Sequence, residues 1–227
     1  MNRRSTWFVW AQLVRVPNVF TVVADVTMGF LFVSVSLRPI SLYLLALFAS
    51  IALYWAGMVL NDVCDYEQDS RERPERPLPS GRIDLRTAKT AGWGLLLLGI
   101  VLASLAGLRR GDGGFDWHPA AMAGATAFCV VAYDRWLKST PLGPPTMGAC
   151  RFFNILLAMA CGGLVADGQG HLGGLANSGW GFGFDASQLV VAAAIGVYIA
   201  GVTWFARSEA HTSNRGLLLG GLAVIVT

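Results

Sequence analysis

The sequence has little charge for its length. Of its 227 residues, 14% are Asp, Glu, Lys or Arg, whereas 54% are hydrophobic. A water-soluble domain needs more polar surface than this to cover itself, so a soluble globular domain is excluded. The net charge is only +3, and no stretch gathers basic residues into a face suited to nucleic acid. The composition indicates a chain that lies in a lipid bilayer and has no nucleic-acid partner.

The sequence also lacks the usual patterns of metal-binding and disulfide-bonded residues. Its four cysteines form no CxxC pair, and its three histidines stand far apart in the chain. We interpret the cysteines as small buried hydrophobic residues, and we expect neither a disulfide nor a zinc site. The residues in question are Cys64, Cys129, Cys150 and Cys161.

Long apolar segments recur along the whole chain. The predicted spans are Val19–Leu37, Leu42–Leu60, Ala91–Leu108, Pro119–Tyr133, Phe152–Ala166 and Leu189–Ala206. Each has about the 20 residues that cross a bilayer core, or somewhat fewer. A seventh begins at Gly216 and reaches only about 18 Å by Thr227, against a core of about 30 Å. The pattern predicts an all-α polytopic helical bundle of six complete spans and a partial seventh. We expect one domain over residues 1–227, truncated at its C-terminus.

The positive residues are divided unevenly between the connections. If the N-terminus is cytoplasmic, all but three of the 17 Lys and Arg residues fall on the inner side. The outer exceptions are Arg38, Arg109 and Arg110. Membrane proteins concentrate Lys and Arg in cytoplasmic loops. The asymmetry therefore predicts an integral protein of the inner or plasma membrane with a cytoplasmic N-terminus. The inner connections also concentrate acids, amides and prolines, so we expect an active site that faces the cytoplasm.

One inner connection begins with an acidic stretch, "NDVCDYEQD", which covers Asn61–Asp69 directly after the second apolar segment. Asp62, Asp65 and Asp69 are three and then four residues apart, so they share one face of a helix that continues from this segment. Such like charges destabilise a helix by about 0.2–0.5 kcal/mol per pair, and by more where water is scarce. Oxygen ligands in this number suit Mg²⁺, which also accepts phosphate oxygens. The stripe predicts a magnesium site.

Two interpretations of this stretch are open. In one, Arg71, Arg73 and Arg76 neutralise the acids of a solvated helix end, which explains the charge balance but not the one-sided stripe. In the other, the Pro-rich stretch "RPERPLPSGR" forms a stiff turn that holds Arg76 and Arg82 near the carboxylates. Metal-binding carboxylates, guanidinium groups and a membrane mouth together suit a ligand with a diphosphate head and a hydrocarbon tail.

Here the sequence resembles a known family. "NDVCDYEQD" followed by "RPERPLPSGR" is similar to the first aspartate-rich motif, NDxxDxxxD, of the UbiA superfamily of intramembrane prenyltransferases. "LVRVPNVFTVVADVTMGF" and "YDRWLKSTPLGPPTMGACRFFN" are also similar to that superfamily, so the resemblance covers essentially the whole chain. Within the superfamily, the three stretches "RPERPLPSGR", "LGPPTMGACRFFN" and "ARSEAHTSNRG" look most like the EboC-type subgroup.

The resemblance implies roles for individual residues. Catalytic roles would fall to Asp62, Asp65, Asp69, Lys138 and Glu209. The ligands of Mg²⁺ would be Asn61, Asp62, Asp65 and Asp69. Substrate contacts would come from Arg15, Asn18, Asn61, Arg76, Arg135, Arg151 and Asn214. In this scheme the metal and the cations stabilise the negative charge on diphosphate as the allylic C–O bond breaks.

The sequence departs from the family pattern at the second aspartate-rich motif. The inner segment after the sixth span reads "ARSEAHTSNRG", in which Glu209 is the only acid and Asn214 takes a position that fits an aspartate. A second metal therefore has fewer carboxylate ligands than the family pattern provides. Three kinds of compensation are open. They are the carboxylate of Asp134, the imidazole of His211 and the guanidinium groups of Arg207 and Arg215.

Asp25 lies inside the first span, where a carboxylate is costly. We expect it to face the bundle interior or a wet cavity and to find a partner there. Asp25 would either serve as a ligand, or be protonated and form a hydrogen bond that helps two helices pack.

The leading hypothesis for function is an enzyme, a Mg²⁺-dependent prenyltransferase that moves a prenyl group from an isoprenoid diphosphate to a small acceptor. The alternative is a non-catalytic UbiA-like membrane protein that binds or helps export a pathway lipid or product, which the altered second motif motivates. A transporter with an acidic mouth is a weaker third possibility, because only Asp25 lies deep in a span.

Overall fold

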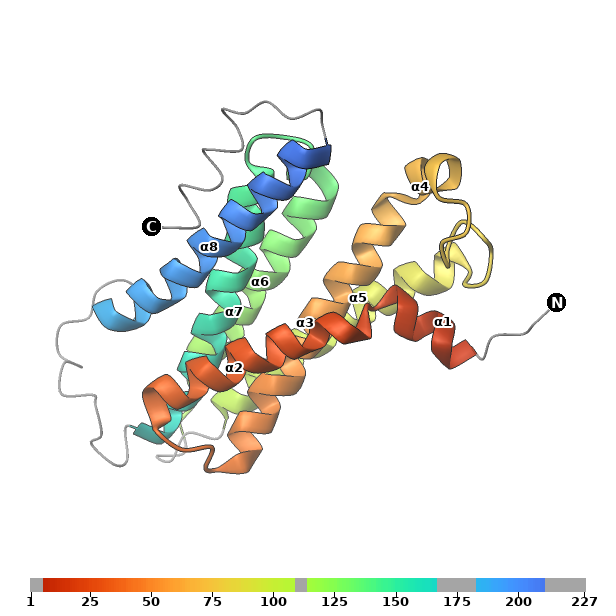
Figure 1. Ribbon diagram of the computed structural model, residues 1–227. Coiled ribbons are helices and arrows are strands. Elements are labelled where there is room, and N and C mark those ends of the chain that lie inside the picture. Colours follow the sequence, from red (N-terminus) through yellow and green to blue (C-terminus); the bar gives the residue numbers. More distant parts are fainter. Residues whose placement is uncertain (1–5, 109–113, 167–182, 211–227) are drawn as a thin grey trace.

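The computed structural model describes residues 6–108, 114–166 and 183–210, and the regular elements of these residues are helices (Figure 1). In chain order they are α1 (Thr6–Leu13), η1 (Val16–Asn18), α2 (Val19–Ser34), α3 (Ile40–Cys64), α4 (Tyr66–Glu72), α5 (Leu85–Gly107), α6 (His118–Ala132), η2 (Tyr133–Leu137), α7 (Gly143–Ala166) and α8 (Ala186–Ala210). The η1 segment is a 3-10 turn, and η2 is a π-helical turn that continues α6.

Five stretches of the described residues are long and apolar enough to cross a membrane. They are Val16–Ser34, Ile40–Cys64, Leu85–Gly107, Gly143–Val165 and Ala186–Arg207. The fourth predicted span, Pro119–Tyr133, is not among them; it forms α6, which passes directly into the π-helical turn η2 at Tyr133. The predicted polytopic all-α membrane bundle is confirmed, whereas its count of six complete spans is not. The partial seventh span lies outside the described residues.

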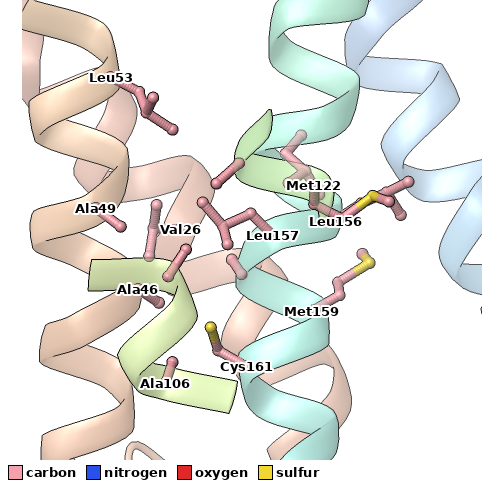
Figure 2. Packing of buried hydrophobic residues seen from close by; sticks show 14 of the residues in the cluster. Val26, Ala46, Ala49, Leu53, Ala106, Met122, Leu156, Leu157, Met159 and Cys161 are labelled. Atoms are coloured by element: carbon pink, nitrogen blue, oxygen red, sulfur yellow. The ribbon is translucent and has the colours of Figure 1, made fainter. Parts of the chain in front are cut away.

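The long helices pack around a core of small and medium-sized side chains. Helix α3 packs along α5, and α7 packs against α2, α6 and α8 (Figure 1). Figure 2 shows the centre of this core, where Val26, Ala46, Ala49, Ala106 and Leu157 are all fully buried. Alanines let the helix axes approach closely, and interiors packed in this way leave few voids larger than a water molecule.

Glycines set two of these helix contacts. A Cβ added at Gly99 of α5 would lie 2.6 Å from Cγ of Leu53 on α3. A Cβ added at Gly148 of α7 would lie 2.4 Å from the carbonyl oxygen of Gly196 on α8. Both distances are shorter than a carbon atom tolerates, so a larger residue would push the helices apart.

Large apolar side chains also cover the outside of the bundle. Examples with more than half of their surface exposed are Phe48, Leu97, Phe128 and Val190. A soluble surface would not carry so many apolar groups on neighbouring helices, whereas lipid chains would contact them without cost. The exterior therefore supports an integral membrane protein.

A smaller hydrophobic cluster fixes the polypeptide at the end of the bundle where α1 and α4 lie (Figure 1). Its buried members are Val9, Leu13, Val59, Leu78, Ile83 and Ala88. The cluster joins α1 to the Pro-rich loop after α4, and Gly81 turns that loop with a φ of +69°. Leu78 and Ile83 thus anchor the loop, which holds Arg76 in a fixed place.

Candidate active site

The three predicted aspartates lie at the junction of α3 and α4. The helix does not continue unbroken as the sequence predicted, because α3 ends at Cys64 and α4 begins at Tyr66. Helical hydrogen bonds nevertheless cross the junction, from the Asp65 amide to the Asn61 carbonyl and from the Asp69 amide to the Asp65 carbonyl. The aspartates therefore stay close together. Asp62 and Asp69 are only 7% and 5% exposed, so they are not part of a solvated helix end.

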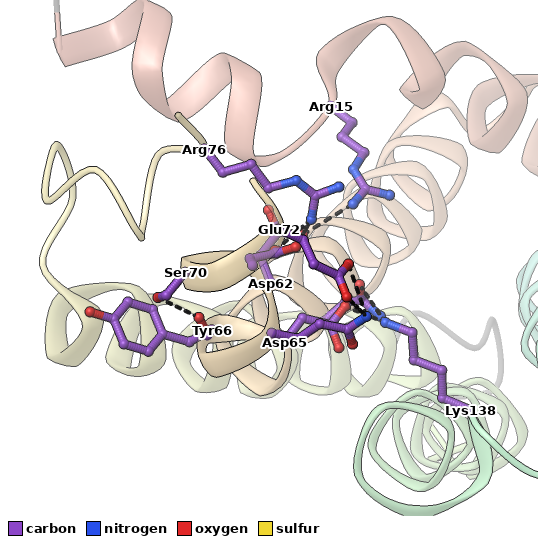
Figure 3. Close-up of polar contacts among 11 residues, drawn as sticks. Arg15, Asp62, Asp65, Tyr66, Ser70, Glu72, Arg76 and Lys138 are labelled. Atoms are coloured by element: carbon purple, nitrogen blue, oxygen red, sulfur yellow. Dashed lines mark hydrogen bonds and ion pairs between the residues drawn. The ribbon is translucent and has the colours of Figure 1, made fainter. Parts of the chain in front are cut away.

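Two arginines from different parts of the chain contact Asp62 and Asp69. Figure 3 shows Arg15 and Arg76 pointing toward Asp62. Nη2 of Arg15 donates to Oδ1 of Asp62 at 3.1 Å across a separation of 47 residues. Nη1 of Arg76 donates to Oδ2 of Asp69 at 2.6 Å and lies 3.8 Å from Oδ1 of Asp62. Burial alone would lower the pKa of Arg76, but the hydrogen bond and the charge of Asp69 outweigh it and raise that pKa. Arg76 stays charged, and it bridges two carboxylates.

The third aspartate, Asp65, pairs with a lysine in the turn that connects η2 to α7. Nζ of Lys138 donates to Oδ2 of Asp65, and it also lies 3.3 Å from Oδ1 of Asn61 (Figure 3). Nδ2 of Asn61 in turn donates to Oδ1 of Asp134 at 2.9 Å. Asn61 therefore connects the aspartate cluster to η2, with its carbonyl oxygen toward a cation and its amide toward a carboxylate.

Asp134 is the residue of this group that the sequence offered only as one of several possibilities. Its Oδ2 atom is buried and has no hydrogen-bond partner among the described residues. Burial raises the pKa of Asp134 to about 7, from an ordinary 3.8, even though Asn61 and Lys138 lower it. Near neutral pH this carboxyl group is therefore divided between its protonated and ionised forms.

Arg15 reaches the aspartates because the chain turns sharply between α1 and α2. Arg15 adopts the left-handed conformation, with φ 52° and ψ 54°, which is uncommon for a residue other than glycine. Pro17 follows in η1, and the amide of Asn18 donates to the Arg15 carbonyl at 2.9 Å. Local strain of this kind is often found at functional sites. Here the left-handed turn directs the guanidinium group of Arg15 back toward α3.

Two cavities meet at this cluster. The outer one, of about 380 Å³, is lined mainly by charged and polar side chains that include Asp65, Asp69, Arg76 and Lys138. The inner one, of about 480 Å³, runs between α2, α3, α6, α7 and α8 and is lined by residues such as Val22, Leu53, Val130 and Ile199. Both cavities share Arg15, Met58, Asn61, Tyr133 and Met147. A polar mouth therefore continues into a more apolar interior.

The fixed charges at the mouth are balanced. Three cations, Arg15, Arg76 and Lys138, pair with the three carboxylates of Asp62, Asp65 and Asp69. Within the described residues, this cluster brings no net positive charge to an anionic ligand. A diphosphate would need additional positive charge in order to bind here tightly.

The chemistry of the four predicted metal ligands fits a divalent ion, because carboxylate and amide oxygens are the donors that Mg²⁺ prefers. In the described part of the chain, no three carboxylate, imidazole or thiol groups converge closely enough to form a metal cage. Such a cage is not required, since Mg²⁺ is often held by one or two carboxylates together with water and phosphate oxygens. Donor type supports the metal prediction, while one oxygen of each aspartate is paired with Arg15, Arg76 or Lys138.

Other predicted residues lie at different places. Arg151 and Asn18 line the inner cavity, whereas Arg135 is exposed and lines neither cavity. The prediction that Arg82 lies near the carboxylates is wrong, because its guanidinium group donates to Oγ of Ser80 and to the Glu75 carbonyl within the loop. Arg82 thus forms hydrogen bonds within the loop, whereas Arg76 of the same loop contacts the aspartate cluster.

The second inner segment is described only in part. Nη1 of Arg207 donates to the Thr140 carbonyl at 2.7 Å, so it holds α8 against the turn before α7. The side chain of Glu209 and all of His211, Asn214 and Arg215 lie outside the described residues. Their roles stay predictions.

Sequence reasoning missed several polar residues of the inner cavity. They are Ser50, Tyr54, Thr126, Tyr133 and Asn154, all of which line it. A single polar residue within an apolar span is the signal that could have indicated them, because polar groups in spans usually face the bundle interior. The same reasoning correctly predicted that Asp25 finds a partner, which is Arg151 at 2.6 Å.

The sequence of this chain is similar to those of known proteins. The model of a family described as the UbiA prenyltransferase family matches residues 22–225. Digeranylgeranylglyceryl phosphate synthase of Methanobrevibacter smithii is 33% identical over 61% of this chain and 47% of that relative. The protein of the same name from Saccharolobus solfataricus is 32% identical over 58% of this chain and 43% of that relative. The matched part thus spans less than half the length of these relatives.

A solved structure from work on the biosynthesis of digeranylgeranylglyceryl phosphate synthase in membranes has a similar fold. The superposition has a TM-score of 0.63 and covers 97% of this chain and 85% of that chain. The two sequences are 22% identical, so this likeness concerns the fold alone.

Proposed function

The chain belongs to the UbiA prenyltransferase family, and from this premise we propose that it transfers a prenyl group from an isoprenoid diphosphate to a small acceptor. The observation that carries the proposal is the junction of a polar mouth with an apolar inner cavity at the aspartate cluster. A diphosphate head requires polar surroundings with hydrogen-bond donors, whereas a prenyl tail requires apolar ones. The two cavities provide these surroundings in the correct order, from the end of the bundle inward.

Charge balance supports a requirement for a divalent ion. Because Arg15, Arg76 and Lys138 are already neutralised by the three aspartates, fixed charge alone does not attract a diphosphate. Asn61, Asp62, Asp65 and Asp69 would hold the ion, for which Mg²⁺ is our proposal. When bound, the ion would supply the positive charge that stabilises the departing diphosphate.

In the reaction that we propose, the bond between C1 of the prenyl group and the diphosphate oxygen breaks, and both electrons leave with the diphosphate. An acceptor oxygen or carbon then forms a bond to C1 and gives up a proton. Lys138 and Arg76 line the mouth, so they would orient the diphosphate and stabilise its growing charge. The apolar inner cavity would keep water away from the allylic cation.

The acceptor class is suggested by the names of the relatives, which are synthases of digeranylgeranylglyceryl phosphate. We infer that a glyceryl phosphate lipid is the first acceptor to test, together with geranylgeranyl diphosphate as the donor. The resemblance to the EboC-type subgroup stays a prediction.

The experiment compares two neighbouring acids in the full-length protein. Asp65→Asn removes the carboxylate that Lys138 contacts, whereas Glu67→Gln changes an exposed acid that lines neither cavity. We expect Asp65→Asn to lower Mg²⁺-dependent release of diphosphate in membranes at least 100-fold, a loss of roughly 3 kcal/mol of transition-state stabilisation. Glu67→Gln should retain the wild-type rate. Equal release by the wild type and Asp65→Asn would contradict the proposal.

A non-catalytic lipid-binding protein is the second candidate. It is motivated by the second inner segment, "ARSEAHTSNRG", in which Glu209 is the only acid. Mass spectrometry of lipids bound to the purified protein, combined with the release assay, separates the two. Bound prenyl lipid without turnover on any acceptor would support the second candidate and exclude the enzyme.

A further inference from the structure

Two cysteines lie opposite each other in the helical hairpin that α6, η2 and α7 form. Cys129 lies eight residues before η2 ends at Leu137, and Cys150 lies seven residues after α7 begins at Gly143. At the helical rise of ~1.5 Å per residue, each is about 10–12 Å from the turn that joins the two arms. Because α6 and α7 pack against each other, the hairpin places both cysteines at the same level of the bundle.

The two thiol groups are in direct contact. The side chains of Cys129 and Cys150 form a hydrogen bond with each other. Both are free thiols rather than halves of a disulfide. A single buried cysteine usually serves as a small hydrophobic residue. Two thiols in contact have a further reaction open to them, because oxidation joins them with only a small movement of the backbone.

The pair is accessible from the inner cavity. Cys150 lines this cavity, as does Met147, which lies one turn earlier on the same face of α7. Cys129 lies on α6 between Thr126 and Val130, which line the same cavity. Most of the lining is apolar, and the bundle around it is surrounded by lipid. A reagent that dissolves in the bilayer and enters this cavity would therefore reach Cys150.

The backbone at Cys129 is irregular. The amide of Tyr133 donates to the carbonyl groups of both Cys129 and Val130, where α6 passes into the π-helical turn η2. Turns of this kind inside a helix are frequent at functional sites. Because the Tyr133 amide has two acceptors, it keeps a partner when this turn shifts. Cys129 is thus on a part of α6 that can adjust toward α7.

We propose that Cys129 and Cys150 form an oxidation site for hydroperoxides that dissolve in the membrane. The thiolate of one cysteine attacks the terminal peroxide oxygen, the O–O bond breaks, and the alkoxide leaves and takes up a proton. The resulting sulfenic acid is attacked by the second thiol, so that a disulfide forms and water leaves. Two thiols and one hydroperoxide give one disulfide, one alcohol and one water. Sulfur is oxidised, and the peroxide oxygen is reduced.

The position of the pair suits a reversible reaction. It lies toward the mouth of the bundle, the end that the positive-inside rule places in the cytoplasm. Cytosolic thiols keep most cysteines reduced, and the disulfides that do form there are mostly transient and serve in redox sensing. The dithiol is then the resting form, and the disulfide forms when hydroperoxide accumulates.

A disulfide at this place would alter the wall of the inner cavity. It brings the two sulfur atoms to about 2.05 Å, closer than hydrogen-bonded thiols, so α6 and α7 must shift. Asp134 and Arg151 are charged groups close to Cys150, and Asp134 accepts from Asn61 of the aspartate cluster. We expect oxidation to slow prenyl transfer, and this consequence rests on the proposed function.

Mass spectrometry tests the site without any assay of turnover. The full-length protein in a Cys64→Ser background, which removes the exposed cysteine, would be placed in lipid vesicles and treated with cumene hydroperoxide or hydrogen peroxide at equal concentration. Non-reducing peptide maps should show a disulfide between Cys129 and Cys150, formed several-fold faster by the apolar reagent and removed by dithiothreitol. No such disulfide with either reagent would overturn the inference. Equal or faster reaction with hydrogen peroxide would overturn the membrane as the source of the oxidant.

Three variants locate the reaction. Cys129→Ser and Cys150→Ser, which are close to the wild type in size, should each abolish the disulfide and leave the remaining cysteine as a sulfenic or sulfinic acid. Cys161→Ala is the matched control, because Cys161 is fully buried on α7, eleven residues beyond Cys150. It should form the disulfide at the wild-type rate. A disulfide that includes Cys161 would overturn the assignment.

Release of diphosphate separates this inference from the proposed function. Oxidised protein should release diphosphate several-fold more slowly than reduced protein, and dithiothreitol should restore the rate. Cys129→Ser should keep its rate after the same treatment. If the reduced wild type releases no diphosphate, the proposed function fails, while the peptide maps still decide the inference. If the disulfide forms and the rate is unchanged, the predicted effect on transfer is overturned.

Discussion

At the scale of single residues, each carboxylate of the aspartate cluster has a cation that comes from another segment. Asp65 and its partner Lys138 are 73 residues apart, and Asp62 and Arg15 are 47 apart. Mutual repulsion of the aspartates is thus relieved by protein cations in the ligand-free molecule. A metal and a diphosphate would have to rearrange these pairs, because each carboxylate oxygen in an ion pair is not free to bind a metal.

Asp134 should make the stability of the protein depend on pH. Its folded pKa of about 7 exceeds the ordinary 3.8 because burial disfavours the charged form. The stabilising contribution of the protonated group is complete below the ordinary pKa, and it is lost as pH rises through about 7. We expect the melting temperature of the wild type to fall between pH 5 and pH 8 relative to Asp134→Asn, measured in the same detergent. An equal pH profile for the two proteins would contradict the burial of this carboxyl group.

The buried hydroxyl of Ser50 should lower the stability of the protein. Its unpaired, buried hydroxyl costs about 1–3 kcal/mol in the ligand-free protein. Ser50→Ala should therefore raise the melting temperature without ligand by a few degrees, at about 2–4 °C per kcal/mol for a chain of this size. Ser104→Ala is the control, because Oγ of Ser104 donates to the Ile100 carbonyl. A lower melting temperature for Ser50→Ala would show that the hydroxyl has a partner, such as a buried water.

At the scale of elements, the site depends on two interruptions of regular helix. The chain turns at Arg15 between α1 and α2, and it breaks for one residue at Asp65 between α3 and α4. The loop after α4 is then fixed by the buried side chains of Leu78 and Ile83. These features bring Arg15, Asp65 and Arg76 around one mouth, which a pair of straight helices would not do.

The contact between α7 and α8 gives an element-scale prediction. A Cβ at Gly148 would lie 2.4 Å from the Gly196 carbonyl oxygen, whereas a Cβ at Gly163, on the same helix, would meet nothing within 4 Å. We expect Gly148→Ala to lower the melting temperature by several degrees. Gly163→Ala should leave it unchanged or raise it slightly, since alanine favours a helix by about 1 kcal/mol over glycine. Thermal unfolding in detergent measures both, and equal effects would contradict the close packing.

At the scale of the whole molecule, the apolar exterior and the five candidate spans establish a membrane protein, while its orientation is a prediction from charge. The Pro-rich loop and the turn before α7 lie at the end of the bundle that bears the aspartate cluster. The positive-inside rule places this end in the cytoplasm. Substrates would then enter the mouth from the cytoplasmic side.

Cysteine labelling tests this orientation. Ser80, in the Pro-rich loop, and Ser36, between α2 and α3, are both exposed. In a Cys64→Ser background, we expect a membrane-impermeant maleimide to label Ser80→Cys only in inside-out vesicles and Ser36→Cys only in right-side-out vesicles. The reverse pattern would place the candidate active site on the outer face.

The sequence by itself determined the membrane bundle and the aspartate stripe, because hydropathy and residue spacing are local properties of the chain, whereas Lys138 was indicated only by the resemblance to the UbiA superfamily. Only the tertiary structure decided that α6 passes into a π-helical turn, that Arg82 closes its own loop, and that Arg151 pairs with Asp25 across 126 residues. The same holds for the buried, unpaired hydroxyl of Ser50. Whether a polar side chain finds a partner depends on which helices pack together, and that is set by the close approach of small residues far apart in the chain.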